Sequence, residues 1–113
     1  MTMENIYKKM GADRFLPEAG WNDILIRLDR KLSMLDPDYQ VLQIKEKFGA
    51  LRFYYATDVK ETAVLEAMDR YVREAEHESA KTCEICGKSG RQRENAKRLK
   101  TLCEEHASAW MNG

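Results

Sequence analysis

A β-hairpin signal occupies residues 39–57, which read YQVLQIKEKFGALRFYYAT. Apolar and polar side chains alternate on both sides of Phe48-Gly49-Ala50, which supplies the turn. The predicted apolar face carries Leu42, Ile44, Phe48, Leu51, Phe53 and Tyr55. The predicted polar face carries Gln43, Lys45, Lys47, Arg52 and Tyr54. Because one face is apolar, the sheet needs other elements to cover it.

Helical patterns precede and follow the hairpin. From Trp21 onward, apolar residues recur at every third or fourth position, and this helix is expected to end before Pro37, because the residue before a proline avoids the helical conformation. A second helix is predicted over residues 60–79, capped by Thr57 or Asp58. Its predicted core face consists of Val64, Leu65, Met68, Tyr71, Val72 and Ala75. Both helices therefore have an apolar side that can cover the sheet.

Two short pairs of candidate metal ligands lie near the C-terminus. Cys83 and Cys86 are separated by two residues, and sixteen residues later Cys103 and His106 repeat that spacing. Thiolate and imidazole ligands in two such pairs are typical of tetrahedral zinc. The alternative is a free Cys-x-x-Cys redox pair beside an unrelated Cys103 and His106. Two correctly spaced pairs together favour a Zn²⁺ ion bound by all four residues.

The residues around these pairs predict a compact zinc-binding module over residues 83–113. Gly87 suits a tight turn after the first pair. Thr101 and Glu104 are interpreted as a capping box that opens a helix, whose first turn would carry the second pair. A zinc knuckle, a short hairpin and a helix in this order resemble the treble-clef class of zinc finger. With four protein ligands, such a site has no open position for water and is structural.

These elements predict an α+β protein with a helix–β-hairpin–helix core and a C-terminal treble-clef-like zinc finger. We place the core in residues 1–80 and the zinc module in residues 81–113. The segment from Ser79 to Thr82, which joins them, is short, so the two parts are expected to pack together. The chain has 113 residues, a length that fits one domain with a small appended module.

A run of basic residues lies between the two ligand pairs and is opposed only by Glu94. It consists of Lys88, Arg91, Arg93, Lys97, Arg98 and Lys100. Such a patch can bind phosphate groups through sequence-independent electrostatics. The alternative is a solvated connector whose charges balance the acidic helix over residues 60–79. The chain as a whole is neutral, with 19 basic and 19 acidic side chains, so its net charge gives no general attraction to nucleic acid.

The polar face of the hairpin is a second candidate surface. Lys45, Lys47 and Arg52 accompany Tyr54 there. Basic side chains beside an aromatic ring suit the stacking of single-stranded nucleic acid on a sheet. An ordinary solvated sheet face explains the same residues equally well. The pattern leaves open whether this face and the basic run share one side of the molecule.

Catalysis is not expected from this sequence. Of the two histidines, His106 is assigned to the metal and His77 lies in the acidic end of a predicted helix. There is no spare cysteine nucleophile, no serine elbow and no glycine-rich phosphate loop. No apolar run approaches the length of about 20 residues that a membrane span needs, and the first residues lack a signal-peptide pattern. We therefore expect a cytoplasmic protein without membrane contact.

Two stretches resemble known groups of proteins. The hairpin sequence Lys45-Glu-Lys-Phe-Gly-Ala-Leu-Arg-Phe-Tyr54, with the C-terminal ligand pairs, resembles small bacterial and phage proteins that have no established activity. This resemblance covers roughly residues 20–110 and implies a phage or mobile-element origin. The tail also resembles DksA/TraR-type zinc fingers in Cys83-x-x-Cys86-Gly87, Arg93 and Leu102-Cys103, with His106 in place of their fourth cysteine. The second resemblance implies binding to RNA polymerase.

The function expected first is that of a non-catalytic, zinc-containing protein–protein interaction module, such as a phage- or mobile-element-encoded regulator of a host complex. Neutral charge, a closed metal site and the lack of a catalytic constellation favour this interpretation. The alternative is a nucleic-acid-binding protein that uses the basic run over residues 88–100 and the polar face of the hairpin.

Overall fold

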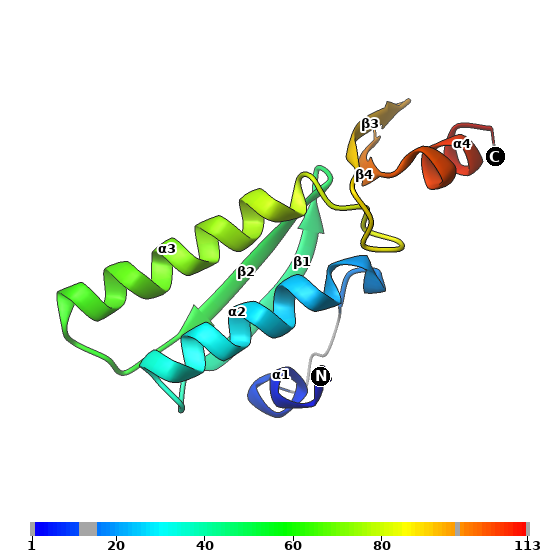
Figure 1. Cartoon of the computed structure of the whole chain (residues 1–113). Coiled ribbons are helices and arrows are strands. Elements are labelled where there is room, and N and C mark those ends of the chain that lie inside the picture. Colours follow the sequence, from blue (N-terminus) through cyan, green and yellow to red (C-terminus); the bar gives the residue numbers. More distant parts are fainter. Residues whose placement is uncertain (1, 12–15, 97, 113) are drawn as a thin grey trace.

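The computed structural model describes residues 2–11, 16–96 and 98–112 of the chain (Figure 1). Over those residues it contains four α-helices and two antiparallel hairpins, which confirms the predicted α+β class. In chain order the elements are α1 (Glu4–Lys9), the 3-10 helix η1 (Ala19–Trp21), α2 (Asn22–Leu35), β1 (Gln40–Lys47), β2 (Ala50–Ala56), α3 (Thr62–Ser79), β3 (Arg91–Asn95), β4 (Arg98–Leu102) and α4 (Glu104–Asn112). Within the described ranges, no helix is both long and apolar enough to cross a membrane.

The main core lies between the β1–β2 hairpin and the helices α2 and α3, which run side by side on one face of that sheet (Figure 1). The short helix α1 packs beside α2 and adds Ile6 to the same cluster. The most deeply buried side chains include Ile6, Trp21, Leu25, Leu28, Leu32, Tyr39, Ile44, Leu51 and Met68. Burial of each such side chain stabilises the fold by about 1.5–3 kcal/mol, so this cluster supplies most of the driving force for folding.

A two-residue turn closes the β1–β2 hairpin. Lys47 pairs with Ala50, so Phe48 and Gly49 form the turn between them. Both turn residues have positive φ values, 56° for Phe48 and 81° for Gly49, as a type I′ turn requires. Glycine adopts this left-handed conformation freely, whereas phenylalanine does not. Phe48 therefore occupies a backbone position that its residue type does not favour.

A β-bulge changes which residues of β1 face the core, so part of the predicted apolar face differs from the observed one. The register shifts between Val41 and Gln43, and the extra residue turns Leu42 outward, where it is 60% exposed, while Val41 is 3% exposed. Phe48, at the turn, is 64% exposed. The prediction that Leu42 and Phe48 belong to the core was therefore wrong. Ile44, Leu51, Phe53 and Tyr55 do face the helices, as the alternation indicated.

Helix α3 covers the sheet and also closes the free edge of β2. The hydroxyl of Ser79 accepts a hydrogen bond from the amide of Leu51 at 2.9 Å, and a carboxylate oxygen of Glu76 accepts one from the amide of Phe53 at 3.0 Å. The predicted caps of this helix were wrong: its N-cap residue is Glu61, without a side-chain capping bond. Thr57 instead donates its hydroxyl to Asp36, because the loop before α3 returns past the end of α2.

The C-terminal part forms a smaller second cluster at one end of the elongated molecule (Figure 1). Its buried members are Cys83, Leu102, Cys103 and Ala107, with Ile85 and Trp110 packed against them. Several hydrogen bonds tie this part to the main core. The indole nitrogen of Trp21 donates to the carbonyl of Thr82 at 2.9 Å, and the amide of Gly20 donates to the carbonyl of Glu84 at 2.9 Å.

Candidate metal centre

The first pair of candidate ligands lies in a tight loop that is held by backbone hydrogen bonds. The amide of Gly87 donates to the carbonyl of Cys83 at 2.9 Å, which closes the loop as its sequence predicted. The amide of Cys83 in turn donates to the carbonyl of Lys88 at 2.7 Å. The amide of Glu84 donates to the carbonyl of Thr101 at 2.9 Å. The last of these bonds joins the loop to strand β4, so both ligand pairs are fixed relative to each other.

The second pair lies where β4 passes into α4. Cys103 directly precedes the helix and its carbonyl accepts a hydrogen bond from the amide of Ala107 at 2.8 Å, while His106 lies in the first helical turn. Both ligands therefore point from the start of one helix, as predicted. The proposed capping box was wrong, because Thr101 belongs to β4. Its hydroxyl donates to the carbonyl of Gly49 and its amide donates to the carboxylate of Glu84.

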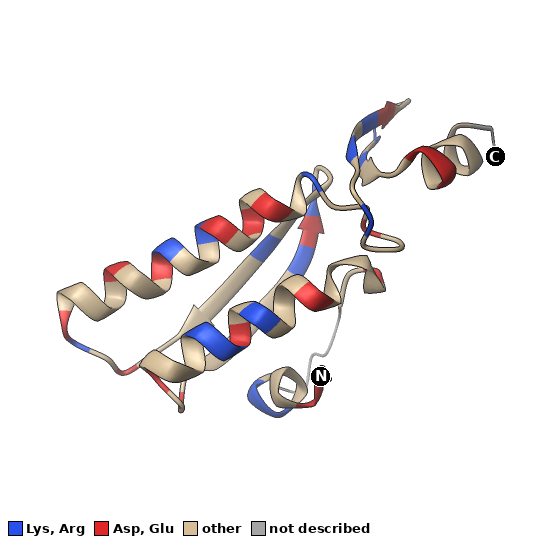
Figure 2. Cartoon of the chain, viewed as in Figure 1, with Lys and Arg blue, Asp and Glu red and all other residues tan. Residues whose placement is uncertain are grey.

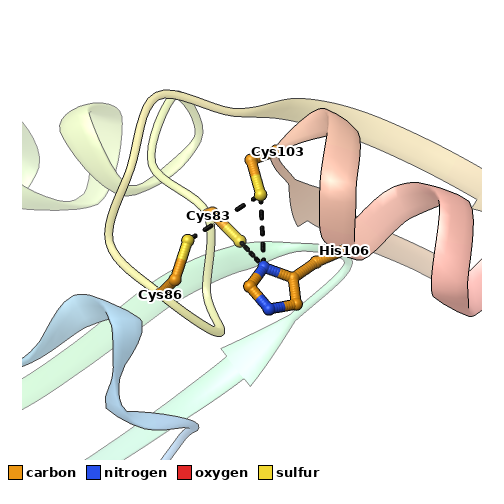
Figure 3. A group of neighbouring side chains, drawn as sticks. All are labelled: Cys83, Cys86, Cys103 and His106. Atoms are coloured by element: carbon orange, nitrogen blue, oxygen red, sulfur yellow. Dashed lines mark hydrogen bonds between the residues drawn. The ribbon is translucent and has the colours of Figure 1, made fainter.

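The four candidate donor atoms converge on a common centre (Figure 3). All of them lie within 4.8 Å of one another. The sulfurs of Cys86 and Cys103 are 3.8 Å apart, and Nδ1 of His106 lies 3.6 Å from the sulfur of Cys83 and 3.2 Å from that of Cys103. A tetrahedral zinc site has sulfur–sulfur edges of about 3.8 Å and sulfur–nitrogen edges of about 3.6 Å. The cluster is thus compatible with a tetrahedral metal site.

The backbone favours the thiolate, the form that binds metals, at Cys83 and Cys103. At Cys86 the amide of Lys88 acts to lower the pKa, but desolvation and the neighbouring sulfurs of Cys83 and Cys103 outweigh it, and the pKa of this thiol is raised. Burial acts to raise the pKa of Cys83, but amide groups of Cys103, Cys86 and Ile85 point at its sulfur and lower that pKa to about 6. The amide of His106 likewise lowers the pKa of Cys103. The hydrogen bond between His106 and Cys103 raises the pKa of the imidazole. A cation bound to the cluster would take the place of these protons.

The 3-10 helix η1 packs directly on the Cys83–Gly87 loop, a contact that no sequence pattern indicated. A Cβ atom built on Gly20 would lie 2.2 Å from the carbonyl oxygen of Cys83 and 2.4 Å from the carbonyl carbon of Glu84. By sequence alone, Gly20 is only a glycine that precedes Trp21. Its role, which is to let two backbone segments touch, depends on a contact across more than sixty residues and is therefore invisible in local spacing.

Glu84 is a buried acid beside the candidate ligands, and no sequence pattern pointed to it. Its side chain is 4% exposed, accepts a hydrogen bond from the amide of Thr101 at 3.2 Å and pairs with the ammonium of Lys100 at 3.7 Å. Burial raises the pKa of Glu84 above that of an ordinary glutamate. The ion pair and the amide bond offset this desolvation and join the loop to β4.

Three residues of the basic run between the ligand pairs form ion pairs within the C-terminal part. Arg91 and Arg93 approach the carboxylate of Glu104 at 3.8 and 3.2 Å, and Lys100 pairs with Glu84. The partners are thus acids of α4 and of the cysteine loop, and not the acidic helix that the sequence analysis proposed. The remaining members of the run are Lys88 and Arg98, which are exposed, and Lys97, which lies outside the described residues.

The polar face of the β1–β2 hairpin brings its predicted residues together. Lys45 pairs with Arg52 across the strands, and Gln43 pairs with Tyr54. Figure 2 shows basic bands on both strands toward the end that meets the C-terminal part. On β3, Arg91 and Arg93 alternate with Gln92, which donates to the carbonyl of Phe48 at 3.1 Å. The two arginines therefore lie on the face of β3 opposite the β1–β2 turn.

Comparison with known proteins gives no relative. A scan against protein-family models, and searches of curated proteins and of solved structures, find no match to this chain. The resemblances to small phage proteins and to DksA/TraR-type fingers therefore stay predictions. The function is inferred below from the geometry and chemistry of the chain's own residues.

Proposed function

We propose that the protein is a non-catalytic binding protein in which Cys83, Cys86, Cys103 and His106 hold a structural zinc ion. The observation that supports this proposal is a set of four protein donor atoms that all lie within 4.8 Å of one another. Three thiolates and one imidazole are the donor set of zinc, whereas magnesium and calcium prefer oxygen ligands. With all four positions taken by side chains, the metal has no position for a substrate or an activated water.

The order of elements around the cluster supports a treble-clef-like finger. One ligand pair comes from the Cys83–Gly87 loop, the β3–β4 hairpin follows, and the start of α4 supplies the second pair. The cluster of buried side chains in this part is small, with Leu102 and Ala107 as its main apolar members besides the cysteines. A core of that size does not stabilise a fold by itself, so metal binding would provide the missing free energy.

The proposed role of the zinc ion is to position a binding surface. The finger, residues 81–113, contacts the turn of the β1–β2 hairpin through two hydrogen bonds. Gln92 donates to the carbonyl of Phe48, and Thr101 donates to that of Gly49.

The two histidines of the chain provide a matched test. Protein purified without added metal should contain one zinc per chain, and cobalt substitution should give the visible bands of a tetrahedral site with three thiolates and one imidazole. His106→Ala should lose the metal, whereas His77→Ala, which alters an exposed histidine on α3, should retain it. Equal zinc content in the two variants, or a cobalt spectrum of an octahedral oxygen site, would contradict the proposal.

A further inference from the structure

We propose that the outer face of the β1–β2 hairpin, together with Phe48 at its turn, binds a single strand of nucleic acid. The outer face is defined here as Gln43, Lys45, Lys47, Arg52 and Tyr54. The inference rests on the proposed function in one respect: the metal-bound finger would hold the turn in place. It goes beyond that function because it assigns a surface and a partner class.

The charges of the outer face call for an anionic partner. Lys45 lies directly opposite Arg52, and like charges in that position destabilise a sheet unless an anion separates them. Lys47 follows on the same face. Among the described residues, none of these three cations forms an ion pair, in contrast to Arg91, Arg93 and Lys100 of the finger. A chain of phosphates would supply the missing negative charge.

Two exposed aromatic rings accompany the cations. Tyr54 is 44% exposed and Phe48 is 64% exposed. Large aromatic rings usually stabilise a fold by being buried in its core, so their exposure here is unusual. The ammonium of Lys45 lies 5.7 Å from the ring centre of Tyr54, and that of Lys47 lies 5.8 Å from the ring centre of Phe48. Each ring thus has a phosphate-binding group beside it. This combination lets a base stack on the ring while its phosphate contacts the neighbouring lysine.

Phe48 occupies a position that neither backbone preference nor burial explains. Its φ of 56° lies in the left-handed region, where a type I′ turn favours asparagine or glycine. The side chain gains little from burial there, because it projects into solvent at the tip of the hairpin. A residue that breaks both the backbone preference and the burial preference points to a functional role. Stacking on a nucleic-acid base would explain an exposed aromatic ring at this position.

The turn that carries Phe48 is held from the finger side. Gln92 donates to the carbonyl of Phe48 at 3.1 Å, and Thr101 donates to that of Gly49. The backbone of Lys100 approaches Gly49 so closely that a Cβ atom there would lie 3.2 Å from its carbonyl carbon. The tip is therefore fixed before a ligand arrives, which lowers the entropy lost on binding.

The size and chemistry of this surface favour a single strand over the other anionic partners. From Gln43 to Lys47 the face extends about 14 Å, enough for about four stacked nucleotides. In a duplex the bases are already stacked and their faces are not available to the rings. An acidic protein segment would satisfy the cations but would leave unexplained the exposed rings and the unfavourable backbone of Phe48.

Binding can be measured with zinc-loaded protein and a fluorescent single-stranded oligonucleotide of mixed sequence, by anisotropy over a salt series. We expect the logarithm of the association constant to fall with the logarithm of salt concentration with a slope of about −2, from three phosphate contacts. The matching duplex and a labelled glutamate-rich peptide should bind more weakly. Equal or tighter binding of the duplex or of the peptide would overturn the proposal, and the peptide result would indicate a protein partner.

Matched variants locate the surface. Lys45→Gln with Lys47→Gln should reduce the salt slope by about 1.4, whereas Lys60→Gln with Lys81→Gln, which removes the same charge from exposed lysines elsewhere, should leave it unchanged. Phe48→Asn suits the turn and should keep the fold, yet it should weaken binding by about fivefold or more. Tyr7→Ala, at an exposed ring on α1, should not.

Zinc content and thermal unfolding of each sample separate this proposal from the proposed function. A protein that holds no zinc and has a disordered finger would refute the structural metal site. A zinc-loaded, folded protein that fails to bind the oligonucleotide at low salt would refute the surface assignment alone. Binding that Phe48→Asn leaves unchanged would also refute it.

Discussion

At the residue scale, Gly20 shows how one missing side chain allows two parts of the molecule to meet. Its amide donates to the carbonyl of Glu84, and its Cα lies against the backbone of the Cys83–Gly87 loop. Side chains can rotate away from a new methyl group, but the backbone of a loop that is held by hydrogen bonds cannot. The space at Gly20 is therefore required by packing, independently of its backbone conformation.

Gly20→Ala is accordingly expected to destabilise the protein by about 2–4 kcal/mol, because the new Cβ would overlap the backbone of Cys83 and Glu84. Denaturant unfolding measures this change, and zinc affinity should fall with it. Gly11→Ala is the control, since a Cβ at Gly11 meets no atom of the described residues within 4 Å and should alter stability by less than about 0.5 kcal/mol. Similar effects of the two substitutions would show that the contact at Gly20 is not tight.

Tyr39 provides a pH dependence at the same scale. Burial, and then its 2.6 Å hydrogen bond to Asp29, raise the pKa of Tyr39 above its ordinary value of about 10. The folded protein therefore keeps this proton where the unfolded chain releases it. The free energy of unfolding should fall as the pH rises above about 10, with a slope of about 1.4 kcal/mol per pH unit from this group.

Tyr39→Phe tests that expectation through denaturant unfolding over an alkaline pH series. The variant should lose this part of the alkaline slope, and near neutral pH it should be less stable by about 1–3 kcal/mol, because buried Asp29 loses a donor. Tyr7→Phe, on exposed helix α1, should keep the slope of the natural chain. An unchanged slope in Tyr39→Phe would assign the alkaline loss to other groups.

At the scale of elements, α3 protects the hairpin by supplying side chains to the edge of β2. A free strand edge carries unpaired amides that invite pairing with other chains. Here Ser79 and Glu76 accept hydrogen bonds from the amides of Leu51 and Phe53. The helix therefore takes the place of a third strand along that edge, and the two-stranded sheet is stable with the help of its neighbour.

Ser79→Ala should leave the buried amide of Leu51 without a partner and destabilise the protein by about 1–3 kcal/mol. Hydrogen exchange of the Leu51 amide, measured by NMR, should become faster in the variant. Ser89→Ala, at an exposed serine, provides the comparison and should shift stability by less than about 0.5 kcal/mol. Slow exchange of Leu51 in Ser79→Ala would mean that another group satisfies this amide.

At the scale of the whole molecule, two clusters of unequal size are joined end to end, over an extent of 49 × 27 × 26 Å. The large cluster contains most of the buried apolar side chains, whereas the small one has few besides its cysteines. They are joined by the backbone hydrogen bond from Gly20 to Glu84, by the bond from the Trp21 indole to the carbonyl of Thr82, and by the bonds that Gln92 and Thr101 donate to the hairpin turn. Disorder in the finger should therefore reach the turn of the hairpin.

Zinc removal tests this coupling. A strong chelator should disorder residues 81–111 and shift the NMR signals of the Trp21 indole and of Gly49, while amides in α2 and β1 stay protected. The physical reason is that the main core keeps its own buried contacts when the finger is released. Addition of zinc should restore the spectrum. Loss of protection throughout the chain would show that the two clusters unfold as one unit.

Short-range spacing was sufficient to predict the α+β class, the two long helices, the hairpin and the four candidate metal ligands. These features depend on contacts between residues a few positions apart, such as a Cys-x-x-Cys loop or a helical repeat, so periodicity and spacing describe them directly. The hairpin turn was predicted at Phe48-Gly49-Ala50 from the alternation on both sides; the structure has Phe48 and Gly49 in the turn, and Ala50 is already the first residue of β2.

The tertiary structure alone decided how those parts meet. The bulge that turns Leu42 outward, the strand position of Thr101, the pairing of Arg93 with Glu104 and the seat of the cysteine loop on Gly20 all depend on where distant segments come together. In each case the local sequence is compatible with more than one arrangement. Packing and hydrogen bonding between distant segments determine which arrangement forms. The spacing of residues in the sequence identifies the candidates, whereas the residues that each one contacts depend on the folded structure.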